Sequence, residues 1–289
     1  MKRAIKQLAI VGPTASGKSD LAIKIAFEID AYILSIDSLS IYKEIDIVSA
    51  KPSKKELQSV KHFGINEINP DEHFSANIFI ALYKKVLMEC ENKNKNLIIV
   101  GGTSFYLKSL VDGLSEVPTI TQTINKNVQK ELVNLQNCHS YLQGIDPSYI
   151  EKALLLHRAT GLTPSEWFKN NPPIPVIENL DIFNIDVQRD VLRERISQRT
   201  KKMLMLGLID EVCTLEQKYT RLPNSMGAIG IVEVLEYLDG KVTQAKMLEN
   251  ISIHTAQLAK RQQTFNRTQF KNIISAPLED LEQTILNYI

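Results

Sequence analysis

The stretch Gln7-Leu8-Ala9-Ile10-Val11-Gly12-Pro13-Thr14-Ala15-Ser16-Gly17-Lys18-Ser19 decides the fold. Its first five residues form a short apolar run typical of a buried strand, and Ser19–Ile29 carries apolar residues at helical spacing. Gly12–Ser19 fits the pattern G-x-x-x-x-G-K-[ST] between these two elements, where backbone N–H groups and a helix N-terminus converge on an anion. We therefore predict a diphosphate or triphosphate site made by Gly12, Pro13, Thr14, Ala15, Ser16, Gly17, Lys18 and Ser19, with the Ser19 hydroxyl available to Mg²⁺.

Further short apolar runs follow the phosphate loop and alternate with helical stretches. Ala31–Ile36, Leu97–Val100 and Leu180–Ile185 read as strands, and Asn77–Cys90 reads as a helix. Strands separated by helices indicate a parallel sheet, so the prediction is an α/β fold, a P-loop NTPase-like parallel sheet flanked by helices. More helices are expected over 189–204, 207–218, 226–238 and 244–267.

Residues 114–175 differ in character from the rest of the chain. Pro118-Thr119-Ile120-Thr121 opens this stretch and Asn170-Asn171-Pro172-Pro173-Ile174-Pro175 closes it, with polar, helix-compatible segments between them. We predict a small helical insertion domain over 114–175, and a core domain made of 1–113 and 176–289.

Composition places the chain among ordinary globular proteins. It has 289 residues, of which 44% are hydrophobic and 23% charged, and its formal net charge is +1. A nucleic-acid partner would therefore have to meet a local basic patch. No apolar run approaches the 18 residues of a membrane span, and Cys90, Cys138 and Cys213 have neither metal-site nor disulfide spacing. We expect reduced thiols, no membrane association and a cytoplasmic location.

Asp37 follows the predicted strand Ala31–Ile36 and is the candidate general base. A P-loop motor or switch has an apolar strand ending in a magnesium-binding Asp, but Leu97–Val100 runs into Gly101-Gly102-Thr103 instead. An Asp at the neighbouring strand tip would face the phosphate end of the ligand, where it can take a proton from a nucleophile. The alternative is that Asp37 caps the segment Ser38–Tyr42.

Several motifs occur together in one order along the chain. After the phosphate loop come Asp37-Ser38-x-x-x-Tyr42, Ala50-Lys51-Pro52, Gly101-Gly102-Thr103-x-x-Tyr106-Leu107-Lys108, Arg189-x-x-Leu192-x-x-Arg195-Ile196-x-x-Arg199, Met203-x-x-x-Gly207-Leu208-x-x-Glu211-Val212, Ala228-Ile229-Gly230-x-x-Glu233 and Thr255-x-Gln257-x-Ala259-Lys260-Arg261-Gln262-x-Thr264-x-x-Arg267. In this series the sequence resembles the bacterial tRNA dimethylallyltransferases over about 250 residues.

The resemblance implies transfer of a dimethylallyl group from dimethylallyl diphosphate to the exocyclic N6 amine of the adenosine at tRNA position 37, with Mg²⁺ present. It assigns Asp37 as the base and Thr103 as a second catalytic residue that hydrogen-bonds the adenosine. Arg189 and Arg195 would reach the diphosphate, unless they are ordinary solvated helix charges, and Thr103 could instead be a turn residue. The implied tRNA contacts are Asp37, Ser38, Leu39, Ser40, Thr103, Gln257, Lys260 and Arg261, together with the insertion, and we expect a monomer.

A local basic stretch lies near the C-terminus. Residues 250–278 contain no Asp or Glu, while Lys260, Arg261, Arg267 and Lys271 contribute four positive charges. Such a stretch suits phosphate contacts along an RNA stem-loop, although it is also compatible with a packed helix that carries solvated lysines.

Three other functions are compatible with parts of this pattern. A P-loop kinase acting on a small metabolite would use Asp37 to deprotonate a hydroxyl and Arg189, Arg195 and Arg199 as a lid over ATP. Transfer to free AMP would need no RNA surface, and a non-catalytic RNA-binding protein would leave Lys18 and Asp37 unused.

Overall fold

Six parallel strands form the centre of the protein. The computed structural model describes residues 5–138 and 147–288, and within them the strand order is β3-β2-β4-β1-β5-β6. The predicted α/β fold with a parallel sheet is confirmed. The strands are β1 (Gln7–Val11), β2 (Ala31–Ser35), β3 (His62–Phe63), β4 (Asn96–Gly101), β5 (Asp181–Asp186) and β6 (Ile273–Pro277).

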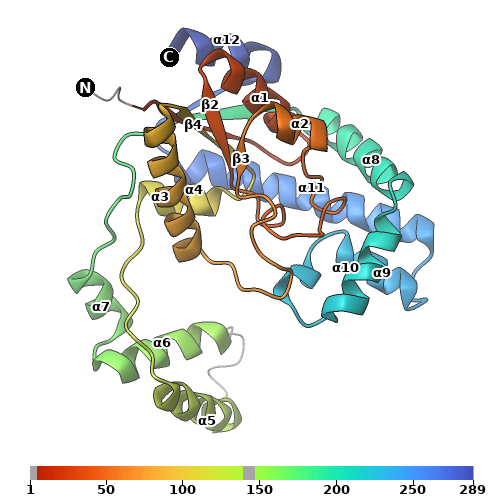
Figure 1. Cartoon of the computed structure of the whole chain (residues 1–289). Helices are drawn as coiled ribbons and strands as arrows, with labels where there is room; N and C mark the ends of the chain where they lie inside the picture. The colour runs from red at the N-terminus through yellow and green to blue at the C-terminus, as the bar shows by residue number, and fades with distance from the viewer. Residues whose placement is uncertain (1–4, 139–146, 289) are drawn as a thin grey trace. The chain divides into compact units, whose positions relative to one another are not determined.

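Helices cover both faces of the sheet, with α1 and α12 on one side and α3, α4 and α11 on the other (Figure 1). Parallel strands covered in this way carry near-continuous apolar runs, as in β1 and β4. The helices are α1 (Lys18–Glu28), α2 (Lys54–Ser59), α3 (Ala76–Lys93), α4 (Ser104–Val111), α5 (Gln122–Cys138), α6 (Pro147–Thr160), α7 (Pro164–Asn170), α8 (Arg189–Met205), α9 (Leu208–Tyr219), α10 (Ile231–Leu238), α11 (Gln244–Gln269) and α12 (Leu278–Tyr288).

Two large apolar clusters among the described residues stabilise the core. One lies between the sheet and helices α1 and α12, with Ile10, Ile25 and Leu281 among its buried members. The other joins the chain segment 41–48 to α9, α10 and α11, and includes Ile45 and Val212. The second cluster fixes a long segment without regular structure against helices from the C-terminal half of the chain.

The expected helix over 226–238 is wrong in part. Residues Asn224–Gly227 form a short 3-10 helix and α10 begins only at Ile231, because Gly230 has φ +98° and interrupts the helical path. The edge strands β3 and β6 were not predicted, since one has two residues and the other ends in a proline.

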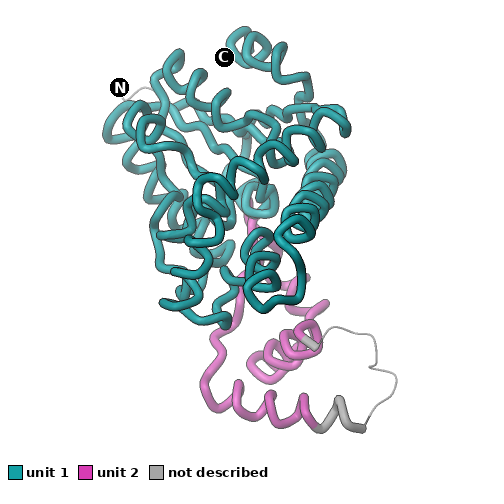
Figure 2. Tube along the Cα trace, turned by 90° about the vertical axis from the view of Figure 1, so that its right-hand side faces the viewer, with its two compact units in different colours: residues 1–111, 177–289 teal, residues 112–176 magenta. Residues whose placement is uncertain are grey.

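The chain divides into two compact units, shown in separate colours in Figure 2. Unit 1 comprises residues 1–111 and 177–289, and unit 2 comprises 112–176, whereas the sequence placed the boundaries at 113/114 and 175/176. Unit 2 is built from α5, α6 and α7, and inside it the Trp167 indole N–H donates to the Glu116 carbonyl at 2.9 Å.

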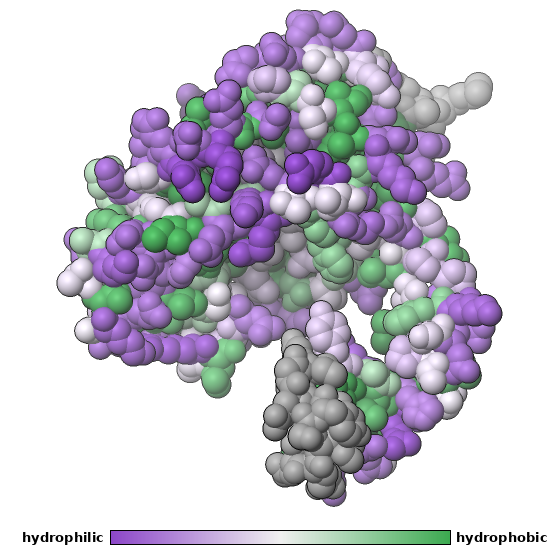
Figure 3. Space-filling model, turned by 180° about the vertical axis from the view of Figure 1, so that it is seen from behind, coloured by the Kyte–Doolittle hydropathy of each residue, from purple (hydrophilic) through white to green (hydrophobic). Residues whose placement is uncertain are grey.

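Hydrophilic residues predominate on the face of the protein seen in Figure 3. None of the helices in the described ranges is long and apolar enough to cross a membrane. Cys90 and Cys213 are free thiols, one buried and one exposed, and the Cys138 side chain lies outside the described part of the protein.

Candidate active site

The register of the sheet brings three predicted segments to one edge. Val11 at the end of β1 pairs with Gly101 of β4, and Ser35 at the end of β2 pairs with Val100. The phosphate loop, Asp37 and Thr103 all follow these carboxyl ends directly, which is where parallel sheets bind ligands.

The phosphate loop runs from the end of β1 into the first turn of α1. Gly17 precedes α1 with φ +92°, a left-handed conformation that glycine adopts without strain. The Lys18 ammonium donates to the Pro13 carbonyl at 3.2 Å, and the Ser16 hydroxyl is buried with no hydrogen-bond partner among the described residues. A buried hydroxyl at the N-terminus of a helix is available to a phosphate oxygen.

Two cations and one carboxylate set the electrostatics of this loop. Although Lys18 is half-buried as a residue, burial of its ammonium lowers its pKa to about 8, against the opposing influence of Asp37. Burial also lowers the pKa of Arg199, whose guanidinium donates to the Thr14 hydroxyl at 3.3 Å. Lys18 and Arg199 carry two positive charges and Asp37 one negative charge. This excess of positive charge at a desolvated site favours a bound phosphate group.

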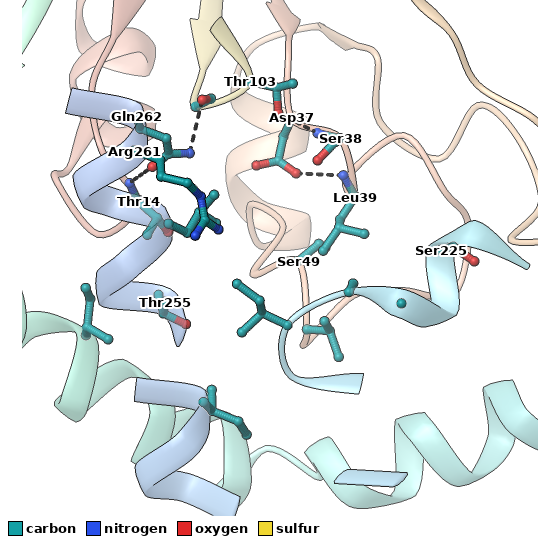
Figure 4. Close-up of a pocket in the computed structure, with 18 of the residues that line it drawn as sticks. Thr14, Asp37, Ser38, Leu39, Ser49, Thr103, Ser225, Thr255, Arg261 and Gln262 are labelled. Carbon is teal, nitrogen blue, oxygen red and sulfur yellow. Dashed lines mark hydrogen bonds between the residues drawn. The ribbon is translucent and has the colours of Figure 1, made fainter. Parts of the chain in front are cut away.

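Asp37 has two functions in the structure. One carboxylate oxygen accepts hydrogen bonds from the backbone N–H groups of Leu39 at 2.9 Å and Ser40 at 3.1 Å, so the capping alternative is observed (Figure 4). Its other oxygen accepts no hydrogen bond within the described ranges. The same side chain lines a cavity that Lys18 also lines, so it is available to a ligand.

Thr103 contacts the turn that follows Asp37. Its hydroxyl accepts from the Ser38 backbone N–H at 3.1 Å, and its own N–H donates to the Ile36 carbonyl at 3.3 Å. Thr103 therefore joins the tip of β4 to the segment after β2, and it also lines the cavity.

Gln262 of α11 connects the phosphate loop to the tip of β4. Its side-chain oxygen accepts from the Thr14 backbone N–H at 2.8 Å, and its amide nitrogen donates to the Gly102 carbonyl at 3.0 Å (Figure 4). A Cβ on Gly102 would lie 2.3 Å from that nitrogen, so only glycine permits this approach. The sequence analysis placed Gln262 in a family motif but did not predict this bridge, because a glutamine within a basic helix does not indicate which distant backbone groups it will contact.

These groups open into a cavity of about 600 Å³, within the usual size range for a ligand site. Asp37, Ser38, Leu39 and Thr103 lie on one side, and Thr255, Arg261 and Gln262 on α11 lie on the other (Figure 4). We call it the central cleft. Its apolar lining residues include Leu39, Tyr42, Val48, Phe105, Tyr106, Ile196, Met203, Ala228, Ile229, Ile251, Leu258 and Phe265.

A smaller polar cavity, of about 70 Å³, lies beneath the phosphate loop. Lys18, Ser19, Asp37, Ser40 and Arg199 are among its lining residues. No cluster of three or more His, Cys, Asp or Glu side chains that could hold a metal occurs in the described part of the chain. The Ser19 hydroxyl, which lines this cavity, is a hard oxygen donor that fits Mg²⁺, and this ion takes its remaining ligands from phosphates and water.

Glu211 of α9 holds the segment that forms one wall of the central cleft. Its carboxylate accepts three backbone hydrogen bonds, from Asp46 at 3.0 Å, Ile47 at 2.7 Å and Val48 at 3.0 Å. Lys51 adds a nearly buried ammonium that donates to the Tyr42 carbonyl at 2.6 Å. The motif Ala50-Lys51-Pro52 thus has a structural function here.

The structure separates the predicted arginines. Arg199 reaches the phosphate loop, whereas Arg189 lines a different cavity between α8 and α11. Arg195 is half-buried one turn before Arg199 and lines none of the described cavities. Arg189 lines none of the described cavities that contain residues of the phosphate loop, and its role toward the diphosphate stays a prediction.

The predicted RNA contacts also fall on more than one surface. Ser38 and Leu39 line the central cleft, while Ser40 is buried and lines the smaller cavity. On α11, Arg261 lines the central cleft, whereas Gln257 and Lys260 line the cavity shared with α8.

Comparisons with known proteins identify the family of this chain. Residues 40–269 match the family model described as IPP transferase. A relative from Sulfurimonas denitrificans named tRNA dimethylallyltransferase is 67% identical over 292 residues, which covers 97% of this chain and 98% of the relative.

Solved structures of transferases also resemble this chain. The tRNA isopentenylpyrophosphate transferase from Bacillus halodurans superposes with a TM-score of 0.75 at 26% identity, covering 99% of this chain and 95% of that one. A eukaryotic dimethylallyltransferase acting on tRNA has a TM-score of 0.82 at 22% identity, covering 98% of this chain and 77% of that one, and shows the fold alone. The resemblance found in the sequence is confirmed, and the chain belongs to the IPP transferase family.

Proposed function

We propose that this protein transfers a dimethylallyl group from dimethylallyl diphosphate to the exocyclic N6 amine of the adenosine at tRNA position 37, releasing diphosphate. One observation carries the proposal: Lys18 of the phosphate loop and Asp37 line a single, largely apolar cavity in a member of this family. The name of the Sulfurimonas relative supports the choice of donor and acceptor.

The phosphate loop would hold the leaving group of this reaction. Negative charge accumulates on the diphosphate as the allylic C–O bond breaks, and the ammonium of Lys18 and the guanidinium of Arg199 lie where they can stabilise it. The Ser16 hydroxyl offers a further donor. Bound Mg²⁺, held through the Ser19 hydroxyl, would supply additional charge neutralisation on the phosphate oxygens.

Asp37 would remove the proton of the attacking amine. Because Leu39 and Ser40 donate to one carboxylate oxygen, the side chain is fixed, and the second oxygen remains for the substrate. A general base in such a position contributes about 10²–10⁴-fold to the rate. Thr103 would act beside it through its contact with the Ser38 backbone.

The apolar walls of the central cleft suit both an isoprenoid chain and a nucleobase taken out of its stack. Phe105, Leu258 and Phe265 lie along these walls. Arg261 lines the same cavity and would contact a phosphate of the RNA. We further propose that the protein works as a monomer in the cytoplasm, where its tRNA substrate is made.

Kinase activity on a small metabolite is not supported by the family to which the chain belongs.

Incubation with labelled dimethylallyl diphosphate, unmodified tRNA and Mg²⁺, followed by nucleoside analysis, tests the proposed transfer directly. We expect label on the N6 atom of one adenosine per tRNA. Label on AMP alone, or release of ADP from ATP with a small acceptor and no prenylated RNA, would contradict it.

A further inference from the structure

A second cavity, of about 810 Å³, lies between α8 and α11. We call it the outer groove. Residues of these two helices form its walls. Its floor is apolar, with Leu192, Ile196 and Leu248. The polar lining residues are Arg189, Arg193, Ser197, Thr200, Lys201, Glu249, Ser252, Gln257, Lys260 and Gln263.

The charge of the outer groove is strongly positive. Four of its lining residues are cations, whereas Glu249 is the single acid among the described lining residues and is already paired with Lys246 at 2.9 Å. Arg189, Lys201 and Lys260 form no ion pair or hydrogen bond with any residue in the described ranges. Cations left without a partner around a groove favour a polyanionic ligand.

The spacing of the cations favours a polymer over a single phosphate. Arg189 and Lys201 are twelve residues apart on α8, which corresponds to about 18 Å along the helix. One phosphate or diphosphate cannot contact both ends of such a row. A strand with a phosphate at every nucleotide can contact all of it.

Helix α11 connects the outer groove to the central cleft. Gln257 and Lys260 line the outer groove and also a shallow hollow of about 480 Å³, which Arg261 and Phe265 line as well. Arg261 and Phe265 in turn line the central cleft. A polyanion that enters the cleft with one nucleotide would therefore cross α11 and reach the row of cations on α8.

We propose that the outer groove binds the sugar–phosphate backbone of the RNA substrate, on the side of α11 away from the reacting nucleotide. The inference rests on the proposed function for its choice of RNA. Arg189, Arg193 and Lys201 contact phosphates, and the hydroxyl and amide groups of Ser197 and Gln257 donate to phosphate or ribose oxygens. Arg189 thus binds a phosphate of the RNA and not the diphosphate of the donor.

The test compares two double variants of the full chain. Arg193→Gln with Lys201→Gln removes two cations of the outer groove. Lys84→Gln with Lys85→Gln removes two exposed cations of α3 that line none of the described cavities. The dissociation constant for unmodified tRNA is measured from 50 to 200 mM salt for both variants and the wild type, after circular dichroism has shown that each is folded.

We expect the groove variant to lower the slope of log K against log salt by about 1.5, since each lost phosphate contact removes about 0.7–0.9. Affinity should fall about tenfold at physiological salt and KM for tRNA should rise, while kcat and KM for dimethylallyl diphosphate stay within twofold. The α3 variant should match the wild type. Equal slopes for the two variants would overturn the proposal.

Two further results separate the possible causes of failure. Polyglutamate that displaces tRNA as effectively as unlabelled RNA does would show a surface for acidic proteins and overturn the choice of RNA. A wild-type protein that binds tRNA but transfers no prenyl group would refute the proposed function, whereas the comparison of salt slopes would still decide whether the groove binds RNA.

Discussion

Burial of Lys18 lowers its pKa to about 8, and this makes diphosphate binding depend on pH. A bound anion favours the charged ammonium and raises that pKa again. Below pH 8 the free protein already carries the charge, so affinity for inorganic pyrophosphate should stay level. Above pH 8 binding requires proton uptake, and affinity should fall by up to tenfold per pH unit. Titration calorimetry between pH 7 and 9.5 measures this change.

Lys18→Arg is the matched control for that experiment, because a guanidinium keeps its charge over the whole range. The ionisation of pyrophosphate itself affects both proteins equally. The variant should therefore show a shallower decline than the wild type. Superimposable pH profiles would mean that the charge of Lys18 does not govern binding.

Asp37→Asn separates the two functions of this residue. Asparagine keeps an oxygen that can accept from the Leu39 and Ser40 backbone N–H groups, so the turn should be preserved. The amide cannot take a proton at neutral pH, and kcat should fall about 10²–10⁴-fold. Single-turnover rates and tRNA dissociation constants measure both properties. A variant that keeps more than a tenth of the wild-type rate would exclude Asp37 as the base.

At the scale of elements, β1, the phosphate loop and α1 were predictable because their signal is local: an apolar run, a glycine pattern and a helical period within the 22 residues from Gln7 to Glu28. Strand β6 was not predictable, because it is an edge strand that pairs with β5 about ninety residues earlier and ends in Pro277.

Which arginine of α8 reaches the phosphate loop depends on the rotation of that helix. Leu192, Ile196 and Thr200 are buried, and Arg199 lies next to Thr200 on this side of the helix. The packing of α8 against α11 determines the rotation of α8 and therefore which arginine reaches the loop.

The connection between α9 and the wall of the central cleft gives a prediction at the same scale. Glu211→Gln retains one acceptor oxygen in place of two, so at least one of the three backbone N–H groups it caps loses its partner. The free energy of unfolding should decrease by about 1–3 kcal/mol. Urea denaturation measures this difference.

Glu216→Gln on the same helix provides the comparison, because the Glu216 carboxylate pairs with the exposed side chain of Arg221 and caps no backbone N–H group among the described residues. That change should cost less than about 1 kcal/mol. KM for tRNA or donor should increase for Glu211→Gln alone, since Val48 lines the cleft. If the two variants unfold at the same urea concentration, Glu211 does not hold the wall.

At the scale of the whole molecule, the two units can be separated by design. The Ile177 backbone N–H donates to the Leu110 carbonyl at 3.0 Å, so the chain leaves unit 1 and returns to it at adjacent points. The two apolar clusters described above contain only residues of unit 1. Replacing Asp112–Val176 by a short Gly/Ser linker should therefore leave a folded protein, because closing a short loop costs little entropy.

This shortened chain should bind pyrophosphate within about twofold of the full chain, since Lys18, Arg199 and Gln262 all belong to unit 1. If the insertion contacts tRNA, as the family resemblance implies, the affinity for tRNA should fall at least about tenfold, which corresponds to a loss of about 1.4 kcal/mol of binding free energy. Calorimetry with pyrophosphate and anisotropy with labelled tRNA measure the two ligands separately. Unchanged tRNA affinity would assign recognition to unit 1 alone, and lost pyrophosphate binding would show that unit 2 supports the phosphate loop.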